Sequence, residues 1–406
     1  MVRICVIGGG AAGEEAAFEA GLKGAEVTII ERRACREPPW KSWPELISQS
    51  PVDGGPPGFR RKSSTSVLTA EAKSAGPSFV TLSNDDRIRF DSIIVATGSR
   101  FKPVPFSGTR KPGVLVLDGA EKYEELGRAC PSMDEAVIVG EGYRGLEVAD
   151  RLCCFGVKAI LMISCWQYEA PAPLVVDVIE DAAREKGIEV QRVSVSRAVG
   201  NFRVEAVVAG GSVIPCDTVI VVPLRLPNPV RSLLRLGQTG AVEVDRAMRT
   251  CEPSMFAAGG CAELKGSILG SGALTSEPSL SGRIAGSNST GSAHSIGGAR
   301  IAQLRVFGLG WSRIGRRAGL PMAFGNQVET VSRRWSPASA CVITHERFSE
   351  KVVGVESIQP TASSPVGLPP LAAGVTLEAL AYGLGSSDIS QISETARMGL
   401  RDWRRS

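Results

Sequence analysis

The sequence predicts an α/β protein with two Rossmann-like dinucleotide-binding domains and a C-terminal α+β domain. Glycine turns of the same spacing occur at Gly8–Gly13 and at Gly140–Gly145, and each turn follows a short apolar run and precedes a helical pattern. Such turns become sparse after about Ser312, where β-rich runs follow. With 406 residues the chain is longer than one hydrophobic core usually supports, so these patterns indicate separate domains.

The first unit occupies about the first thirty residues. The apolar run Val2–Ile7 predicts a strand, and an alanine-rich pattern to about Leu22 predicts a helix. A second apolar run, Glu26–Ile30, predicts another strand that ends at the acidic Glu31. Strand, glycine turn, helix, strand and acid together have the length of one βαβ unit.

The glycines of the first loop have different mechanical roles. Gly8 permits the sharp turn from strand to helix, Gly10 has no Cβ to block a pyrophosphate, and Gly13 lets the helix pack close to the strand. The N-terminus of the helix supplies N–H groups and a partial positive charge to phosphates. Glu31 stands 21 residues after Gly10, where a carboxylate can accept hydrogen bonds from both hydroxyls of an adenosine ribose. These features together predict dinucleotide binding.

The same order of elements recurs in a second unit, whose first glycine, Gly140, stands 132 residues after Gly8. Ala136–Val139 predicts a strand, Leu146 to about Phe155 a helix, and Ala159–Ile163 the next strand. A recurrence at this distance indicates a second domain and not a solenoid repeat. We expect its glycine loop to bind a nicotinamide nucleotide.

The second unit lacks an acid after its second strand. Ser164 stands at that position, where an acid would favour the free ribose of NAD and an arginine the phosphorylated ribose of NADP. Ser164 does neither, although its hydroxyl can donate to a 2′-phosphate. Arg144 in the loop serves either a phosphate or the solvated start of the helix. The choice between NADH and NADPH stays open, and so does the alternative of a retained fold with weakened affinity.

Composition and charge exclude several other functions. Lys and Arg number 46 against 42 Asp and Glu, and this balance gives no electrostatic reason to bind nucleic acid or an anionic membrane. Ten cysteines without C-x-x-C spacing are typical of reduced, mostly buried thiols, and two histidines exclude a histidine-rich metal site. No apolar run approaches the about 20 residues of a membrane span, so we expect a soluble cytoplasmic protein.

The C-terminal region has a pattern of its own. Ala340–Thr344 and Lys351–Glu356 predict two strands in a hairpin-like arrangement around His345, while Leu377–Leu380 and Ile389–Met398 predict helices. We expect His345 to be structural or exposed and not an acid–base group. These patterns predict the α+β domain.

Four further segments match the pattern of one family. Phe90–Ser99 contains a strand and an Ala-Thr-Gly turn, Gly145–Ala149 extends the second loop, and Val244–Thr250 with Met255–Glu263 returns to the first domain. With the two loops, they make the chain resemble the FAD-dependent pyridine nucleotide-disulfide oxidoreductase superfamily. The resemblance implies Rossmann-like domains of the three-layer ββα type, one inserted in the other. It divides the chain into an FAD-binding domain (1–112 and 241–312), an NAD(P)-binding domain (113–240) and a C-terminal α+β interface domain (313–406).

Segments of the C-terminal region resemble one branch of this superfamily. Val306–Leu309, Ser312–Gly315 and Lys351–Val355 are similar to the interface domain of the coenzyme A-disulfide reductase and NADH oxidase branch. This resemblance implies a homodimer.

The chain departs from that branch at the position of its nucleophilic cysteine. The family places this residue about ten positions after Glu31 in a Cys-x-x-Pro context, and here Lys41 stands in its place. Cys35 lies six residues too early, and the interface-domain tyrosine of the branch has no clear match. Gly260 replaces the usual aspartate that contacts the ribityl and phosphate part of the flavin. Thiol–disulfide chemistry is therefore disfavoured.

The segment Glu37–Lys41 is also similar to the Arg-Pro-Pro-Leu-Ser-Lys segment of ferredoxin and rubredoxin reductases, in which the lysine lies beside the flavin. An ammonium there would favour the anionic reduced flavin and raise its potential. Lys41 is one catalytic candidate, with an ordinary surface lysine as the alternative. Glu147 is the other, because the resemblance places it on the first turn of the second helix, facing the junction of flavin and nicotinamide; its alternative is a plain electrostatic role at the helix start.

These observations predict an FAD enzyme that takes hydride from NADH or NADPH and passes electrons to oxygen, a small molecule or an electron-transfer protein. One alternative is a flavin-bound or degenerate subunit of a larger redox complex, and another is a disulfide or persulfide reductase that uses Cys35. No nucleic-acid partner, membrane span or metal site is expected. The predicted cofactor-binding residues are Gly8, Gly10, Ala11, Ala12, Gly13, Glu31, Arg32, Lys41, Ala96, Thr97, Gly98, Gly140, Gly142, Tyr143, Arg144, Gly145, Glu147, Ser164, Gly259, Gly260, Cys261 and Ala262.

Overall fold

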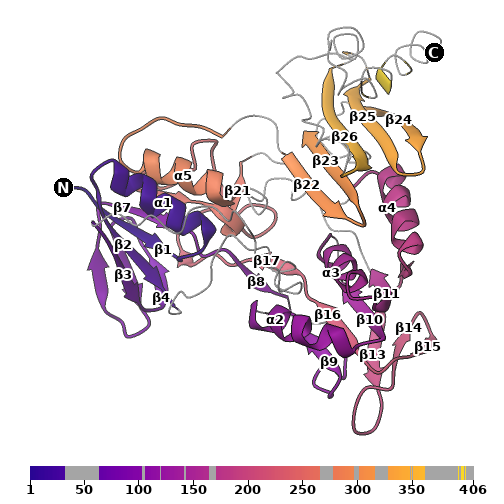
Figure 1. The fold of residues 1–406 in the computed structure, drawn as a ribbon. Helices are drawn as coiled ribbons and strands as arrows, with labels where there is room; N and C mark the ends of the chain where they lie inside the picture. The colour runs from indigo at the N-terminus through magenta and orange to yellow at the C-terminus, as the bar shows by residue number, and fades with distance from the viewer. Residues whose placement is uncertain are drawn as a thin grey trace. The chain divides into compact units, whose positions relative to one another are not determined.

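The computed structural model divides into two compact units, and Figure 1 colours the chain by residue number. The described residues of unit 1 are 1–32, 64–102, 225–265 and 278–296. Those of unit 2 are 106–118, 120–140, 143–163, 171–224, 301–315, 328–347, 349, 351–361, 392, 395, 396 and 398.

Unit 1 is built on a parallel five-stranded sheet with the order β20-β7-β1-β2-β3. The strand, helix and strand predicted around the first glycine loop are confirmed as β1, α1 and β2. The sheet and its two helices are β1 (Arg3–Ile7), α1 (Ala11–Leu22), β2 (Glu26–Glu31), β3 (Thr65–Thr69), β7 (Ser92–Val95), β20 (Met255–Ala257) and α5 (Pro278–Asn288).

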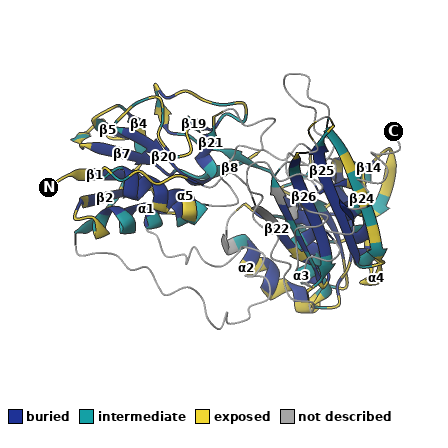
Figure 2. Cartoon of the chain, turned by 90° about the horizontal axis from the view of Figure 1, so that it is seen from above, coloured by how far each residue is buried: buried dark blue, intermediate teal, exposed yellow. Residues whose placement is uncertain are grey.

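An antiparallel layer covers the other face of this sheet. Figure 2 shows α1 and α5 on one face of the parallel strands and β4 and β5 on the opposite face. Val80, Leu82 and Phe90 are buried in the same hydrophobic core as the parallel strands, so three layers enclose one core, as the ββα type predicts. The remaining elements are β4 (Ala72–Ala75), β5 (Phe79–Leu82), β6 (Arg87–Arg89), β8 (Ser99–Phe101), β17 (Arg225–Pro227), β18 (Arg231–Ser232), β19 (Val242–Val244), a short 3-10 helix (Gly259–Cys261) and β21 (Ala262–Leu264).

Unit 2 contains a second parallel sheet, with the order β12-β11-β10-β16-β9. Its helix α3 begins at Tyr143, so the prediction of a start at Leu146 was wrong by three residues, because residues of the glycine motif themselves form the first turn. The elements are β9 (Val114–Val116), α2 (Ala120–Ala129), a 3-10 helix (Cys130–Ser132), β10 (Glu135–Gly140), α3 (Tyr143–Cys153), β11 (Lys158–Ile163), α4 (Pro173–Glu185), β12 (Ile188–Gln191), β13 (Val195–Val199), β14 (Ala206–Ala209), β15 (Ser212–Pro215) and β16 (Val219–Val222).

The second sheet is also covered on both faces, which β10 illustrates. Ala136 and Ile138 belong to the core that includes side chains of α3 and α4, whereas Val137 belongs to the core under the β13-β14-β15 sheet. Alternate side chains of a strand point to opposite faces, so the apolar run Ala136–Val139 fits this position.

The C-terminal sheet is antiparallel and has the order β22-β23-β26-β25-β24. The predicted hairpin is confirmed as β25 and β26, and His345 on β25 is buried, with its Nδ1 3.1 Å from the carbonyl oxygen of Glu346. The predicted domain boundary at 312/313 falls inside β23, because thinning glycine turns do not mark where a sheet begins. The strands are β22 (Ile301–Val306), β23 (Leu309–Gly315), β24 (Val328–Ser336), β25 (Ser339–Glu346) and β26 (Val352–Pro360).

This sheet shares a hydrophobic core with the second parallel sheet. Helix α4 packs on β25 and β26, and α3 packs on β22. Trp311, Val342 and Ile358 lie in one buried cluster with apolar side chains of α3 and α4. In the part of the chain that the structure describes, no helix has the length and apolar character needed to cross a bilayer.

Candidate functional site

The first glycine loop lies at the carboxyl end of β1, where two glycines make close backbone contacts. Gly8 has a φ of +106°, and a Cβ there would lie 2.4 Å from the carbonyl oxygen of Ala96. A Cβ on Gly13 would lie 1.8 Å from the carbonyl oxygen of Gly8. Both positions therefore require glycine for the fold itself.

Gly10 differs from these two glycines because nothing lies within 4 Å of the position that its Cβ would take. It is the N-cap residue of α1 and provides no side-chain cap. Helix α1 begins at Ala11. The N–H groups of its first turn, including those of Ala11 and Ala12, have no acceptor within the helix. This combination of open space and free donors fits a pyrophosphate, so the residues present suit a dinucleotide.

Glu31 is held against the same loop. The N–H of Gly9 donates to its Oε2 at 2.6 Å, so the acid at the end of β2 is fixed beside the glycine turn. The next residue, Arg32, is exposed and lies 3.6 Å from the carboxylate of Glu71, which places the guanidinium in a surface ion pair. Glu31, which the sequence predicts to bind a ribose, therefore lies beside the first glycine loop.

The predicted flavin segment Ala96–Gly98 meets the carboxyl end of β1. Ala96 donates its N–H to the carbonyl of Ile7, and the hydroxyl of Thr97 donates to the carbonyl of Asn228 at 2.6 Å. Gly98 completes the turn with a φ of +65°. Ala96, Thr97 and Gly98 therefore lie directly beyond the end of β7, next to the first loop.

The segment Gly259–Ala262, which follows β20, packs against α1 at Gly259. A Cβ on Gly259 would lie 2.8 Å from the Cβ of Ala12. Cys261 is fully buried, and its Sγ lies 3.4 Å from the carbonyl oxygen of Val95; burial raises the pKa of this thiol. Ala262 is fully buried and Gly260 is partly exposed, so the place of the usual aspartate carries no side chain.

Sequence reasoning missed two residues that support this segment. The hydroxyl of Ser281, which is fully buried on α5, accepts the N–H of Gly259 at 3.0 Å. The buried carboxylate of Glu263 accepts the backbone N–H groups of Gln238 at 3.1 Å and Thr239 at 2.9 Å. Neither contact has a local sequence signal, since the partners are more than twenty residues apart.

The second loop repeats the close packing of the first. A Cβ on Gly140 would lie 2.9 Å from the Cα of Gly145, and both glycines are buried. Tyr143 begins α3, and Arg144 follows it with partial exposure. Glu147 is the fifth residue of α3, so the prediction that it lies on the first turn was wrong, for the same reason as the helix start.

Several predicted site residues lie outside the described residues. They include the catalytic candidate Lys41, the alternative nucleophile Cys35, Gly142 of the second loop, and Ser164.

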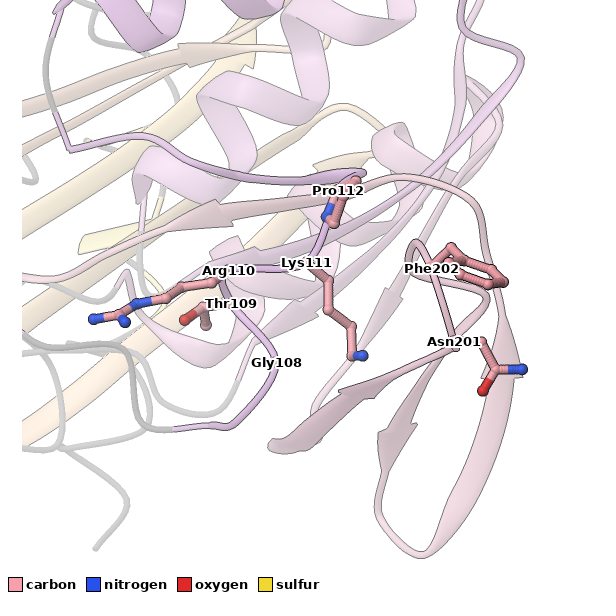
Figure 3. A pocket seen from close by; sticks show the side chains of 7 residues that line it. All are labelled: Gly108, Thr109, Arg110, Lys111, Pro112, Asn201 and Phe202. Atoms are coloured by element: carbon pink, nitrogen blue, oxygen red, sulfur yellow. The ribbon is translucent and has the colours of Figure 1, made fainter.

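A shallow pocket of about 530 Å³ lies elsewhere in unit 2, and no residue of either glycine loop lines it. Figure 3 shows Lys111 between Arg110 on one side and Phe202 on the other. The ammonium of Lys111 donates to the carbonyl of Gly200 at 2.8 Å, so this lysine fixes the neighbouring hairpin.

A family of known proteins matches the part of the chain that contains both glycine loops. The model of the pyridine nucleotide-disulphide oxidoreductase family matches residues 2–283. The chain belongs to this family. The predicted FAD and NADH or NADPH are the cofactors of this pyridine nucleotide-disulphide oxidoreductase family, and the two loops fit them.

Its relatives have different names. The probable ferredoxin reductase CtmF of Castellaniella defragrans is 29% identical over 226 residues, which cover 54% of this chain and 53% of that protein. The chain thus matches about half the length of this relative. The NADH oxidase of Methanocaldococcus jannaschii is 25% identical over 403 residues, which cover 88% of this chain and 87% of that protein.

Solved structures show the same fold. An NAD-dependent persulfide reductase from A. fulgidus superposes with a TM-score of 0.83 and 23% identity, over 98% of this chain and 83% of that chain. A water-forming NADH oxidase from Lactobacillus brevis superposes with a TM-score of 0.79 and 16% identity, over 100% of this chain and 99% of that chain.

Proposed function

We propose that this chain is an FAD-dependent oxidoreductase that takes electrons from NADH or NADPH and passes them to an acceptor other than a cysteine disulfide. The observation that carries the proposal is the presence of two glycine loops, each between a strand of a parallel sheet and the helix after it. Ligands of such sheets bind beyond the carboxyl ends of the strands. One chain therefore offers a dinucleotide site in each unit.

The protein's own residues supply binding and orientation. Gly10 leaves space for a pyrophosphate, α1 directs its N–H groups to that space, and Glu31 accepts from a ribose. In unit 2, the packing of Gly140 on Gly145 brings the start of α3 to the end of β10 for the nicotinamide nucleotide. Bound FAD supplies the redox chemistry, which is the transfer of electrons from the nicotinamide to the acceptor.

The residue at position 41 supports an acceptor other than a disulfide. A disulfide reductase needs a thiolate as nucleophile, and Lys41 offers an ammonium instead. The relatives named NADH oxidase and ferredoxin reductase support two other acceptors, oxygen and an electron-transfer protein. We further propose the order of domains given above, with the C-terminal domain beginning before β22 and not at 312/313, and a homodimer through the C-terminal sheet.

The visible spectrum tests the proposal. The purified full-length chain is expected to show flavin bands that bleach when NADH or NADPH is added without oxygen. Bands that persist with both nucleotides would contradict turnover and favour a non-catalytic subunit of a larger redox complex. A colourless protein that cannot be reconstituted with FAD would overturn the proposal.

Steady-state kinetics with serine variants test the acceptor class. Cys35→Ser is expected to keep the NAD(P)H oxidation rate within about twofold, as is the control Cys251→Ser at an exposed cysteine. Loss of turnover in Cys35→Ser alone would show that the enzyme is a disulfide or persulfide reductase.

A further inference from the structure

Two consecutive cysteines stand at the end of helix α3. Cys153 is the last residue of the helix and is partly buried, and Cys154 begins the turn that follows and is exposed. Both are free thiols. Cys153 donates to the carbonyl of Lys186 at 3.8 Å, and Cys154 donates to the carbonyl of Asp150 at 3.5 Å. The two thiols are therefore adjacent in the sequence, and Cys154 opens the pair to solvent.

No other pair of this kind occurs among the described cysteines. Cys216 is half-buried and Cys251 is exposed, and neither has a cysteine next to it in the sequence. The buried thiols are inaccessible to a reagent in solution; they are Cys5, Cys130, Cys261 and Cys341.

The surroundings of the pair select the chemical class of its ligand. Burial, helped by the charge of Asp150, raises the pKa of Cys153 to about 11, so this thiol remains protonated at neutral pH. A soft metal dication needs thiolates and has to displace that proton. In the described part of the chain, no three Cys, His, Asp or Glu side chains form a group that could hold a metal ion, so a tetrahedral site is not built.

A trivalent arsenical needs neither thiolates nor the further protein ligands of a tetrahedral metal site. An arsenoxide condenses with two neutral thiols: two S–H bonds and the bonds from arsenic to oxygen break, two As–S bonds form, and the protons leave with the oxygen as water. Arsenic keeps its oxidation state, no group is oxidised or reduced, and the product carries no charge. Binding therefore avoids the cost of a thiolate at the half-buried Cys153.

We propose that Cys153 and Cys154 form a vicinal dithiol site for neutral trivalent arsenicals. The bound form loses the two S–H···O contacts to Lys186 and Asp150, which are weak because a thiol is a weak donor. The site uses no residue of the nucleotide loops, so it is independent of the proposed redox function.

Native mass spectrometry of the full-length, FAD-loaded protein tests this site. Phenylarsine oxide is added in the presence of excess 2-mercaptoethanol, which competes with binding to single thiols. We expect one adduct per chain, and we expect dimercaptopropanol to remove it. Cys153→Ser and Cys154→Ser should each lose the adduct, whereas the control Cys251→Ser should keep it.

The result is informative even if one variant folds poorly. Cys154 is exposed, so Cys154→Ser is expected to keep the wild-type melting temperature. Loss of the adduct in this stable variant would then be due to the missing thiol and not to misfolding. Absence of an adduct in the wild-type protein would overturn the proposal. An adduct that persists in the double variant Cys153→Ser/Cys154→Ser would also overturn it, because the arsenical would then bind other cysteines.

Discussion

Two glycines of the first loop are required for different reasons: Gly13 for the packing of the fold, and Gly10 for the space that the ligand occupies. A Cβ atom on Gly13 would lie 1.8 Å from the carbonyl oxygen of Gly8. A Cβ atom on Gly10 would have no other atom within 4 Å. The backbone of Gly10 has a φ of −80°, which any residue can adopt. The same residue type is therefore present for two physical reasons.

Alanine at Gly10 is expected to weaken FAD binding, whereas alanine at Gly13 is expected to destabilise the fold. Gly10→Ala should leave the free energy of unfolding of the FAD-free protein within about 0.5 kcal/mol. Its methyl group should occupy pyrophosphate space and raise the dissociation constant of FAD at least about tenfold, or ~1.4 kcal/mol. Gly13→Ala should destabilise the FAD-free protein by about 1–3 kcal/mol through overpacking.

Denaturant unfolding without FAD and fluorescence titration with FAD measure the two quantities. Tight FAD binding by Gly10→Ala would show that the pyrophosphate does not approach this residue.

Between elements, the contact of α1 with α5 depends on small residues. Cβ atoms on Gly282 and Gly286 would lie 2.1 Å and 2.2 Å from the carbonyl oxygens of Ala12 and Ala16. Arg283 of α5 pairs with Glu15 of α1 at 2.9 Å beside this contact. The two helices therefore touch through backbone, which holds the segment after β21 on the first loop's helix.

Gly286→Ala tests this helix contact. Alanine gains about 1 kcal/mol of helix propensity over glycine, but the neighbouring atom is backbone oxygen, which cannot move aside alone. Overpacking costs about 1–3 kcal/mol, so we expect net destabilisation in denaturant unfolding. Leu280→Ala, at an exposed side chain of the same helix, is the control and should change stability by less than about 0.5 kcal/mol. A stabilised Gly286→Ala would contradict the close contact.

A second contact between elements joins α4 to β24 and depends on pH. Hydrogen bonds from Arg334 and Arg184 lower the pKa of Asp181 below its usual value. A carboxyl whose pKa is lower in the folded state stabilises fully above its unfolded pKa of about 3.9, and this contribution is lost as pH falls through the folded pKa.

Asp181→Asn is therefore expected to lower the melting temperature near pH 7 and to match the wild type at acidic pH. The pair is solvent-exposed, so the loss should stay below about 1 kcal/mol and shrink in high salt. Asp177→Asn is the control. The carboxylate of Asp177 lies 3.9 Å from Arg192, which is a longer ion pair than that of Asp181 with Arg334. Thermal melts between neutral pH and pH 3 measure the difference, and a constant gap across this range would refute the assignment.

At the scale of the molecule, unit 2 unites two sheets that the sequence suggests are separate domains. Asp150 of α3 accepts the N–H of Phe307 at 2.7 Å, and Glu356 of β26 accepts the N–H of Ala172 at 2.8 Å. Glu356 is buried and also accepts from the indole of Trp311 at 3.2 Å. It caps the start of α4 by accepting the N–H of the N-cap residue, Ala172, which provides no side-chain cap of its own.

Hydrogen exchange with mass spectrometry is expected to show that unit 2 opens as one body. Trp311→Leu removes buried volume and the indole donor, at a cost of about 2–4 kcal/mol. Amides of α4 and of the C-terminal strands should then exchange faster together, whereas α1 and β1 in unit 1 should not change. Phe202→Leu, at a side chain that is 93% exposed, is the control. Faster exchange confined to the strands would refute a shared core.

The sequence by itself determined the parts of this protein that depend on neighbours along the chain. The βαβ order around Gly8–Gly13, the acid at Glu31, the recurrence at Gly140–Gly145 and the hairpin of β25 and β26 follow from local periodicity and turn chemistry, and the structure confirms them.

Only the tertiary structure decided the contacts that join distant segments. The burial of Ser281 under Gly259, the cap that Glu356 gives to α4, and the shared core of the two sheets in unit 2 bring together residues far apart in the sequence. A buried N–H must find an acceptor, and an apolar face must find a cover, but neither requirement states which distant segment will provide it.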